Sequence, residues 1–136
     1  MTTKSLAYDH AAYIARVGAP MGEAGGAATT QYGKFAAFTA AIAFSAQFTT
    51  TVAGTVAGHG FQVVKISGTT TTALGTQTIG TATAGSTFNL VLAGTATGGV
   101  ALLQGDVLAA ISLADATGKA AVAYEVQNQP LANVTI

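Results

Sequence analysis

The stretch Phe38-Thr39-Ala40-Ala41-Ile42-Ala43-Phe44-Ser45-Ala46-Gln47-Phe48 decides the fold class of this chain. Its even-numbered residues are all apolar, whereas Thr39, Ser45 and Gln47 occupy odd positions. Strict alternation of this kind is typical of a β-strand with one buried face. In a helix the phenylalanines of this stretch would point in different directions. The stretch therefore predicts a strand whose even-numbered side chains are buried.

Further short apolar runs follow on the C-terminal side of this strand. They lie at residues 61–67, 88–92, 100–103, 107–113 and 122–126, and the Thr- and Gly-rich residues 69–86 add one or two more. About seven to nine short strands, spaced by roughly 8–12 residues and without alternating helices, predict an all-β fold. We expect an antiparallel β-sandwich or jelly-roll-like domain.

The last two runs predict a β-hairpin. Apolar residues alternate in both of them, at 107, 109, 111 and 113 and again at 122, 124 and 126. The segment 115–119 between them contains Gly118, which can adopt the positive φ that a tight turn requires. Glu125 is out of phase with the apolar residues of its run, so we expect it to face solvent or a partner.

Residues 1–34 differ from the rest of the chain. Residues 18–30 form a Gly- and Ala-rich run that would lose too much conformational entropy to pack as a core element. We expect residues 1–34 to form an extended N-terminal arm, followed by the β-sandwich domain at 35–136. Two alternatives stay open for this segment. One is a short helix at 6–17, where apolar residues fit a 3.6-residue period loosely; the other is a terminal segment that folds back on its own domain.

Charged residues are unusually rare. They make up 7% of the chain, with five Lys and Arg, five Asp and Glu and a net charge of zero, against about 25% in typical soluble domains. A surface with so little charge tolerates close contact with a neighbouring protein, because few charges must be desolvated. The scattered cations form no patch for nucleic acid. No apolar run of about 18 residues predicts a membrane span, and we expect no targeting segment.

No motif in the sequence carries an obvious chemistry. The two histidines are His10, in the expected arm, and His59, which lies between two glycines and is expected in a flexible loop. Asp106 follows Gly105 at the start of a strand, which predicts a role in a turn. There are no cysteines, no cluster of three or four metal ligands and no phosphate-binding loop. We therefore expect no catalytic, cofactor-binding or metal-binding residues, and no enzyme.

Three features together resemble one protein family. They are the segment Ala7-Tyr8-Asp9-His10, the Gly- and Thr-rich β domain, and the closing stretch with Gly105-Asp106-Val107-Leu108, Tyr124-Glu125-Val126-Gln127 and Pro130. This pattern resembles the small decoration, or cement, proteins of tailed-bacteriophage capsids. The resemblance implies a jelly-roll or β-sandwich domain, a homotrimer, and an arm that reaches across capsomer boundaries on the capsid exterior.

The expected function is therefore that of a structural virion protein. It would be synthesised in the host cytoplasm and would stabilise the phage head by binding across major capsid protein subunits. Aromatic residues and Arg most often carry interface energy, so the expected contacts of the arm are Tyr8, His10, Tyr13, Arg16 and Tyr32. Another virion β module, such as a tail-tube subunit, a head fibre or an adhesin, is one alternative. A carbohydrate-binding jelly roll is the other, although such a domain normally exposes Trp, which this chain lacks.

Overall fold

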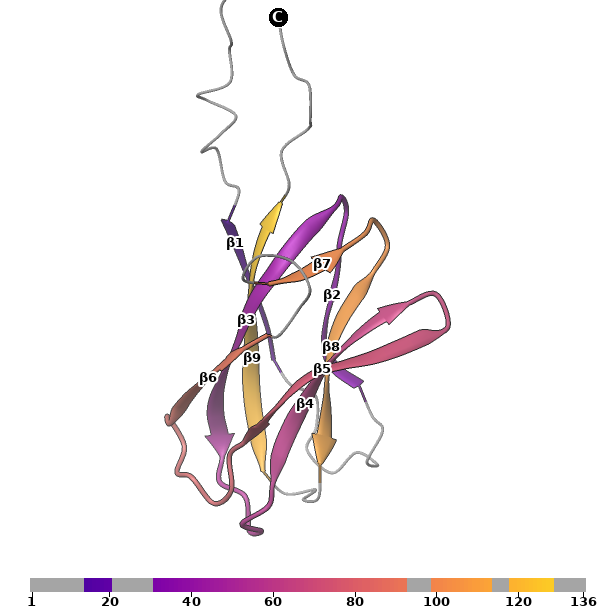
Figure 1. Cartoon of the computed structure of the whole chain (residues 1–136). Coiled ribbons are helices and arrows are strands. Elements are labelled where there is room, and N and C mark those ends of the chain that lie inside the picture. The colour runs from indigo at the N-terminus through magenta and orange to yellow at the C-terminus, as the bar shows by residue number, and fades with distance from the viewer. Residues whose placement is uncertain (1–13, 21–30, 93–98, 114–117, 129–136) are drawn as a thin grey trace, which may run out of the picture.

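The computed structural model of the chain describes residues 14–20, 31–92, 99–113 and 118–128. These residues form nine β-strands and no helix (Figure 1). The strands are β1 (Ile14–Pro20), β2 (Gln31–Ala36), β3 (Ala41–Val52), β4 (Gly60–Ser67), β5 (Thr70–Thr78), β6 (Thr87–Val91), β7 (Val100–Leu102), β8 (Val107–Leu113) and β9 (Lys119–Asn128). The all-β prediction is therefore confirmed.

All of the strand pairs are antiparallel, and they are nested in the sequence. β1 pairs with β9, β2 with β8, β3 with both β6 and β7, and β4 with β5. The chain thus follows the path of one long hairpin whose turn lies between β4 and β5. The hairpin is rolled up so that one sheet has the order β1-β9-β3-β6, with β7 also beside β3, and the other has the order β2-β8-β4-β5. This is the strand order of a jelly roll, to which β7 adds one short strand.

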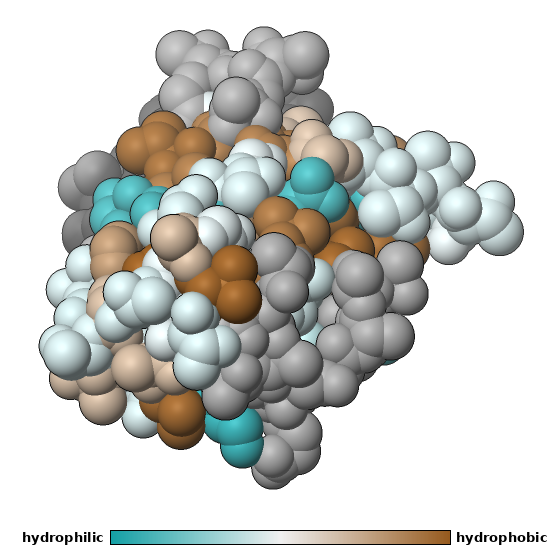
Figure 2. Space-filling view, turned by 90° about the horizontal axis from the view of Figure 1, so that it is seen from below, coloured by the Kyte–Doolittle hydropathy of each residue, from teal (hydrophilic) through white to brown (hydrophobic). Residues whose placement is uncertain are grey.

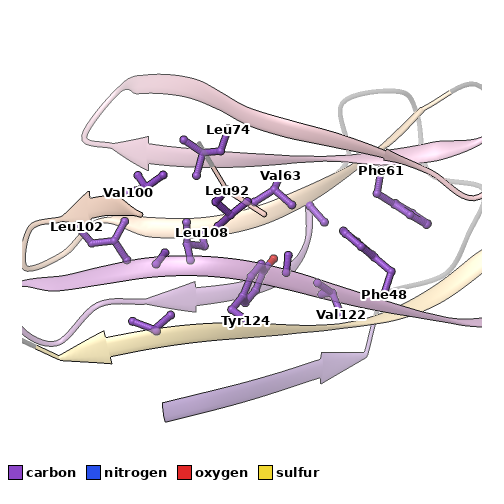
Figure 3. Packing of buried hydrophobic residues seen from close by; sticks show 14 of the residues in the cluster. Phe48, Phe61, Val63, Leu74, Leu92, Val100, Leu102, Leu108, Val122 and Tyr124 are labelled. Carbon is purple, nitrogen blue, oxygen red and sulfur yellow. The ribbon is translucent and has the colours of Figure 1, made fainter. Parts of the chain in front are cut away.

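The core lies between the two sheets. Phe48 of β3 stacks on Phe61 of β4, with ring centroids 5.5 Å apart and ring planes at 8°. Val122 and Tyr124 of β9 face Leu108 of β8 and the other buried apolar side chains in the same layer (Figure 3). The predicted phase of the run 122–126 is confirmed, because residues 122, 124 and 126 are at most 1% exposed.

The phase of the buried residues of β3 changes at Phe44, which the alternation did not predict. Ala43 and Ser45 of β3 pair with Val126 and Glu125 of β9, so Phe44 is the extra residue of a β-bulge. Before the bulge the buried residues have odd numbers, and after it they have even numbers: Ala41 and Ala43, then Ala46, Phe48 and Thr50. The prediction that every even-numbered side chain is buried is therefore wrong for residues 40, 42 and 44, which are half-buried, and for residue 38, which is exposed.

The predicted hairpin between the last two runs is also wrong. β8 pairs with β2 and β4 in one sheet, whereas β9 pairs with β1 and β3 in the other. The residues of β8 that belong to the core are Leu108 and Ala110, not the alternating set that begins at Val107. Consecutive strands with a short connection can pair locally, but here each one completes a sheet with strands that are distant in the sequence.

The segment expected to be an arm lies partly outside the described residues. Residues 1–13 and 21–30 are not described, and the prediction of an arm stays a prediction there. Ile14–Pro20 is strand β1 of the first sheet, and the expected domain boundary after residue 34 falls inside β2. The alternative of a helix over 6–17 is wrong for residues 14–17, which are in β1, while residues 6–13 lie outside the described ranges.

Candidate assembly surface

The five residues expected to make contacts are not brought together by the described structure. Tyr8, His10 and Tyr13 lie outside the described residues. Arg16 is in β1, where its Cα pairs with that of Glu125 in β9. Tyr32 is in β2, in the opposite sheet, and only 7% of its surface is exposed. A contact through the Tyr32 side chain would therefore require the partner to reach a buried group, and the interface role of this set stays a prediction.

Two large apolar side chains are exposed on neighbouring turns at one end of the sandwich. Phe38, in the β2–β3 turn, is 88% exposed, and Leu103, in the β7–β8 turn, is 67% exposed. The two turns are joined by backbone hydrogen bonds: Ala37 N donates to Asp106 O and Gly105 N donates to Ala37 O, both at 2.9 Å. These turns lie at the upper end of Figure 1. These bonds hold the turn of Phe38 beside the turn of Leu103.

The Asp106 side chain braces the second turn from inside. Its Oδ2 accepts a hydrogen bond from Leu103 N at 2.9 Å, and its backbone N donates to Leu103 O at 3.0 Å. The Leu103 N–H, aided by Ser67 and by the positive charge of Lys65, lowers the pKa of the Asp106 carboxyl despite its burial. Asp106 is 5% exposed. The predicted turn role of Asp106 is therefore confirmed, and the turn that it braces presents Leu103.

The sequence did not point to this pair. Phe38 fits the alternation of the following strand, so the pattern predicts that it is buried. Its turn contains no Gly or Pro that would mark it as a turn. Leu103 carries a better signal, since Gln104, Gly105 and Asp106 after it are typical turn residues. What the sequence lacks is any mark that the two turns are neighbours in space.

The remaining exposed large apolar side chains of the described residues do not lie on these two turns. Val91, in β6, is 71% exposed, and Val52 and Val56, at the end of β3 and in the loop after it, are 43% and 42% exposed. Figure 2 shows the molecule from the end opposite to the Phe38 turn: pale, neutral residues surround separate brown ones, and strongly hydrophilic residues are few. The face in Figure 2 is thus short of strongly hydrophilic residues, whereas Phe38 and Leu103 lie at the other end, on turns joined by backbone hydrogen bonds.

His59 is buried at the opposite end of the sandwich, not placed in a flexible loop as expected. It is 1% exposed, its Nδ1 lies 3.2 Å from Leu113 O, and its ring packs edge-on against Phe61 with centroids 5.0 Å apart. Its backbone O accepts hydrogen bonds from Ile79 N and Gly80 N, both at 2.8 Å. His59 therefore ties the β3–β4 loop to the β5–β6 loop, which is a structural role.

Three buried polar atoms have no hydrogen-bond partner among the described residues: Thr50 Oγ1, His59 Nε2 and Tyr124 Oη. Within the same part of the chain, no three His, Cys, Asp or Glu residues gather where they could hold a metal ion. None of the described segments is a helix of the length and apolarity needed to cross a membrane.

Comparison with known proteins adds no relative to this description. No protein-family model matches the chain, and neither the curated proteins nor the solved structures yielded a match. What is shown of this chain is its fold, an antiparallel all-β jelly roll over the described residues.

Proposed function

We propose that this chain is a structural, non-catalytic virion protein: a capsid decoration protein that binds across major capsid protein subunits on the outside of a phage head. In this role it would act as a small oligomer, the trimer that the family resemblance implies. Binding only to the assembled shell would stabilise that shell by mass action.

The observation that carries the proposal is the exposed pair Phe38 and Leu103. Aromatic and aliphatic side chains on hydrogen-bonded turns are suited to anchor an interface, because they bury apolar area on a backbone that is already ordered. Only 7% of the residues of the chain are charged, so a neighbouring protein would have few ions to desolvate on approach. A jelly roll with two large apolar side chains exposed on neighbouring turns supports a binding role better than a catalytic one.

The test is a binding assay with capsid shells that lack this chain. The purified chain is mixed with shells of the phage that encodes it, the shells are pelleted, and the chain bound per shell is measured by gel densitometry. We expect the wild-type chain to saturate the shells and the double variant Phe38→Ser, Leu103→Ser to bind at least about tenfold more weakly, as expected when two interface anchors are lost. Val91→Ser, which removes a similarly exposed apolar side chain elsewhere, is the matched control and should bind normally.

Other outcomes would decide against the proposal. A wild-type chain that does not pellet with intact shells is not a decoration protein, and tubes or rings formed by the purified chain alone would favour a tail-tube subunit. The arm is tested separately by deleting residues 1–13 only. A longer deletion would remove β1, which pairs with β9 along its whole length, and would confound binding with folding.

A further inference from the structure

Most edge strands of the two described sheets carry features that discourage pairing with another chain. β1 contains Arg16 and Pro20. β2 contains Lys34 and a shift of register between Tyr32 and Phe35. β6 and β7 are only five and three residues long. Charged side chains, proline, bulges and short length are the usual protections of a sheet edge against unwanted pairing.

Strand β5 lacks most of these protections. It has nine residues, Thr70–Thr78, with no charged residue and no proline. Among the described strands its only hydrogen-bonded neighbour is β4. Its first four residues are all exposed, and the β4–β5 hairpin projects from the body of the sandwich, at the right of Figure 1 and of Figure 2. A Cβ built on Gly68, in the turn of this hairpin, would meet nothing within 4 Å.

The geometry of the hairpin shows which backbone groups face outward. Ser67 and Thr70 are Cα partners that flank the two-residue turn, so they form a hydrogen-bonded pair. Hydrogen-bonded and non-hydrogen-bonded pairs alternate along an antiparallel ladder. Thr71 and Ala73 therefore direct their N–H and C=O groups away from β4. The regular edge ends at Leu74, which is the extra residue where the register shifts opposite Val63 and Val64.

We propose that the edge Thr70–Ala73 of β5 pairs antiparallel with the same edge of a second copy of this chain. With Thr72 of each copy opposite the other at a two-fold axis, Thr71 of one copy would exchange backbone hydrogen bonds with Ala73 of the second, and the reverse. An interface of this kind is complementary to itself by symmetry. The proposal does not rest on the capsid role.

A second copy fits this edge better than a charged partner would. Thr beside Thr is a favourable cross-strand combination, and neither edge brings a charge to the contact. The chain has a net charge of zero, so two copies do not repel each other at long range. The nearest described cation is Lys65, the Cα partner of Thr72 in β4, and its Nζ lies 3.5 Å from Ala101 O of β7.

A cysteine cross-link tests the predicted register, and the absence of native cysteine makes it unambiguous. In the non-hydrogen-bonded pair at the two-fold axis, the two Cα atoms of residue 72 would be about 4.5 Å apart, within the range of about 4.4–6.8 Å for a disulfide. Under mild oxidation we expect the Thr72→Cys variant to form covalent dimers, with a yield that rises with the fraction of chains in the non-covalent dimer. Thr81→Cys, at an exposed position in the β5–β6 loop, is the matched control and should form no covalent dimer. Equal cross-linking of the two variants would overturn the proposal.

A second variant tests the backbone hydrogen bonds. Thr71→Pro removes an outward N–H that β4 does not use, and proline is tolerated at such positions of edge strands. Because of the two-fold symmetry, two hydrogen bonds are lost, so we expect the dissociation constant measured by sedimentation equilibrium to rise roughly tenfold to a hundredfold. Circular dichroism checks that the variant is folded; if it is not, the Thr72→Cys result still decides. A wild-type chain that forms no dimer at about millimolar concentration also overturns the proposal, because a specific contact of this kind should have a dissociation constant below about 1 mM.

Discussion

Tyr124 carries a hydroxyl group into the core without a hydrogen-bond partner among the described residues. Its side chain is fully buried, and Figure 3 shows its oxygen pointing into the space between the two sheets. Burial raises the pKa of Tyr124, because the phenolate would lose its hydration there. The hydroxyl therefore costs desolvation energy without compensation by a bond in the described structure.

We predict that Tyr124→Phe does not destabilise the protein. The free energy of unfolding should stay the same or rise by about 1 kcal/mol, since the ring packing is kept and an unpaired polar group is removed. Urea unfolding followed by circular dichroism measures the change. A loss of more than about 1 kcal/mol would mean that the hydroxyl has a partner worth a full hydrogen bond.

Asp106 makes stability depend on pH in a defined direction. The pKa of its carboxyl is lowered from the ordinary 3.8 by the hydrogen bond from Leu103 N. A lowered folded-state pKa contributes stability above the unfolded-state pKa, and this contribution is lost as the pH falls through the lowered value. The braced turn should therefore weaken only in acid.

The corresponding variant is Asp106→Asn, which keeps the shape but removes the charge. At pH 7 we expect it to unfold more easily than the wild type by about 1 kcal/mol, because a charge-assisted hydrogen bond becomes a neutral one. The difference between the two proteins should shrink as the pH falls below about 4 and through the lowered pKa of Asp106. Urea unfolding at a series of pH values measures it, and a difference that stays constant with pH would refute this explanation.

At the scale of elements, the start of β9 packs against the loop between β3 and β4. A Cβ on Gly118 would lie 2.5 Å from His59 Nε2 and 3.1 Å from Gly54 Cα. The His59 ring is held by Phe61 and by Leu113 O. The Gly54 backbone is part of the β3–β4 loop, so it could move aside only if the whole loop moved. A side chain at residue 118 is therefore excluded by the packing of two elements, whatever its backbone conformation.

We predict that Gly118→Ala lowers the free energy of unfolding by about 1–3 kcal/mol, the usual range for overpacking. Gly58→Ala, in the same loop region, is the matched control. A Cβ there would meet nothing within 4 Å, so stability should change by no more than about 0.5 kcal/mol. Thermal unfolding of both variants provides the comparison. Adding His59→Ala to Gly118→Ala should cost less than the sum of the two single changes, because the ring that clashes is gone; strict additivity would contradict the clash.

At the scale of the whole molecule, the two sheets are joined by packing of their inner faces. The stacked pair Phe48 and Phe61 spans them, one ring from each sheet. Each sheet also contains strands from both ends of the described chain, such as β1 and β9 in one and β2 and β8 in the other. Neither sheet can therefore be completed before most of the chain is in place, and we expect the two to unfold together.

We predict that Phe48→Ala destabilises the protein by about 3–5 kcal/mol, the range for deleting a buried aromatic ring. The unfolding transition should remain single, because each sheet still contains strands from both ends of the described chain after the stacked pair is lost. Calorimetry measures this as one transition at a lower temperature. Val91→Ala, at a 71% exposed position, should change the stability by no more than about 0.5 kcal/mol. Two separate transitions would contradict the coupling.

How far the sequence predicts this structure depends on the element. The phase of β9 was predicted because Val122, Tyr124 and Val126 alternate without interruption. In β3 the phase was predicted only after Phe44, because the bulge there exists through pairing with β9, some 80 residues away. Of the candidate site, the turn role of Asp106 could be predicted, but the exposure of Phe38 could not. Local pattern does not show that a residue at the end of an alternating run has left the sheet.

The sequence by itself determined that the chain forms short antiparallel strands and that its surface carries little charge. Both follow from local properties: the period of two comes from the pleat of a single strand, and the charge from composition. Only the tertiary structure decided which strands pair, where β3 changes phase, that His59 is buried and that Phe38 and Leu103 lie on joined turns. These features depend on contacts between segments that are far apart in the chain. Several strand arrangements agree equally well with the local pattern, and only the pairing of distant strands and the packing of the two sheets select one of them.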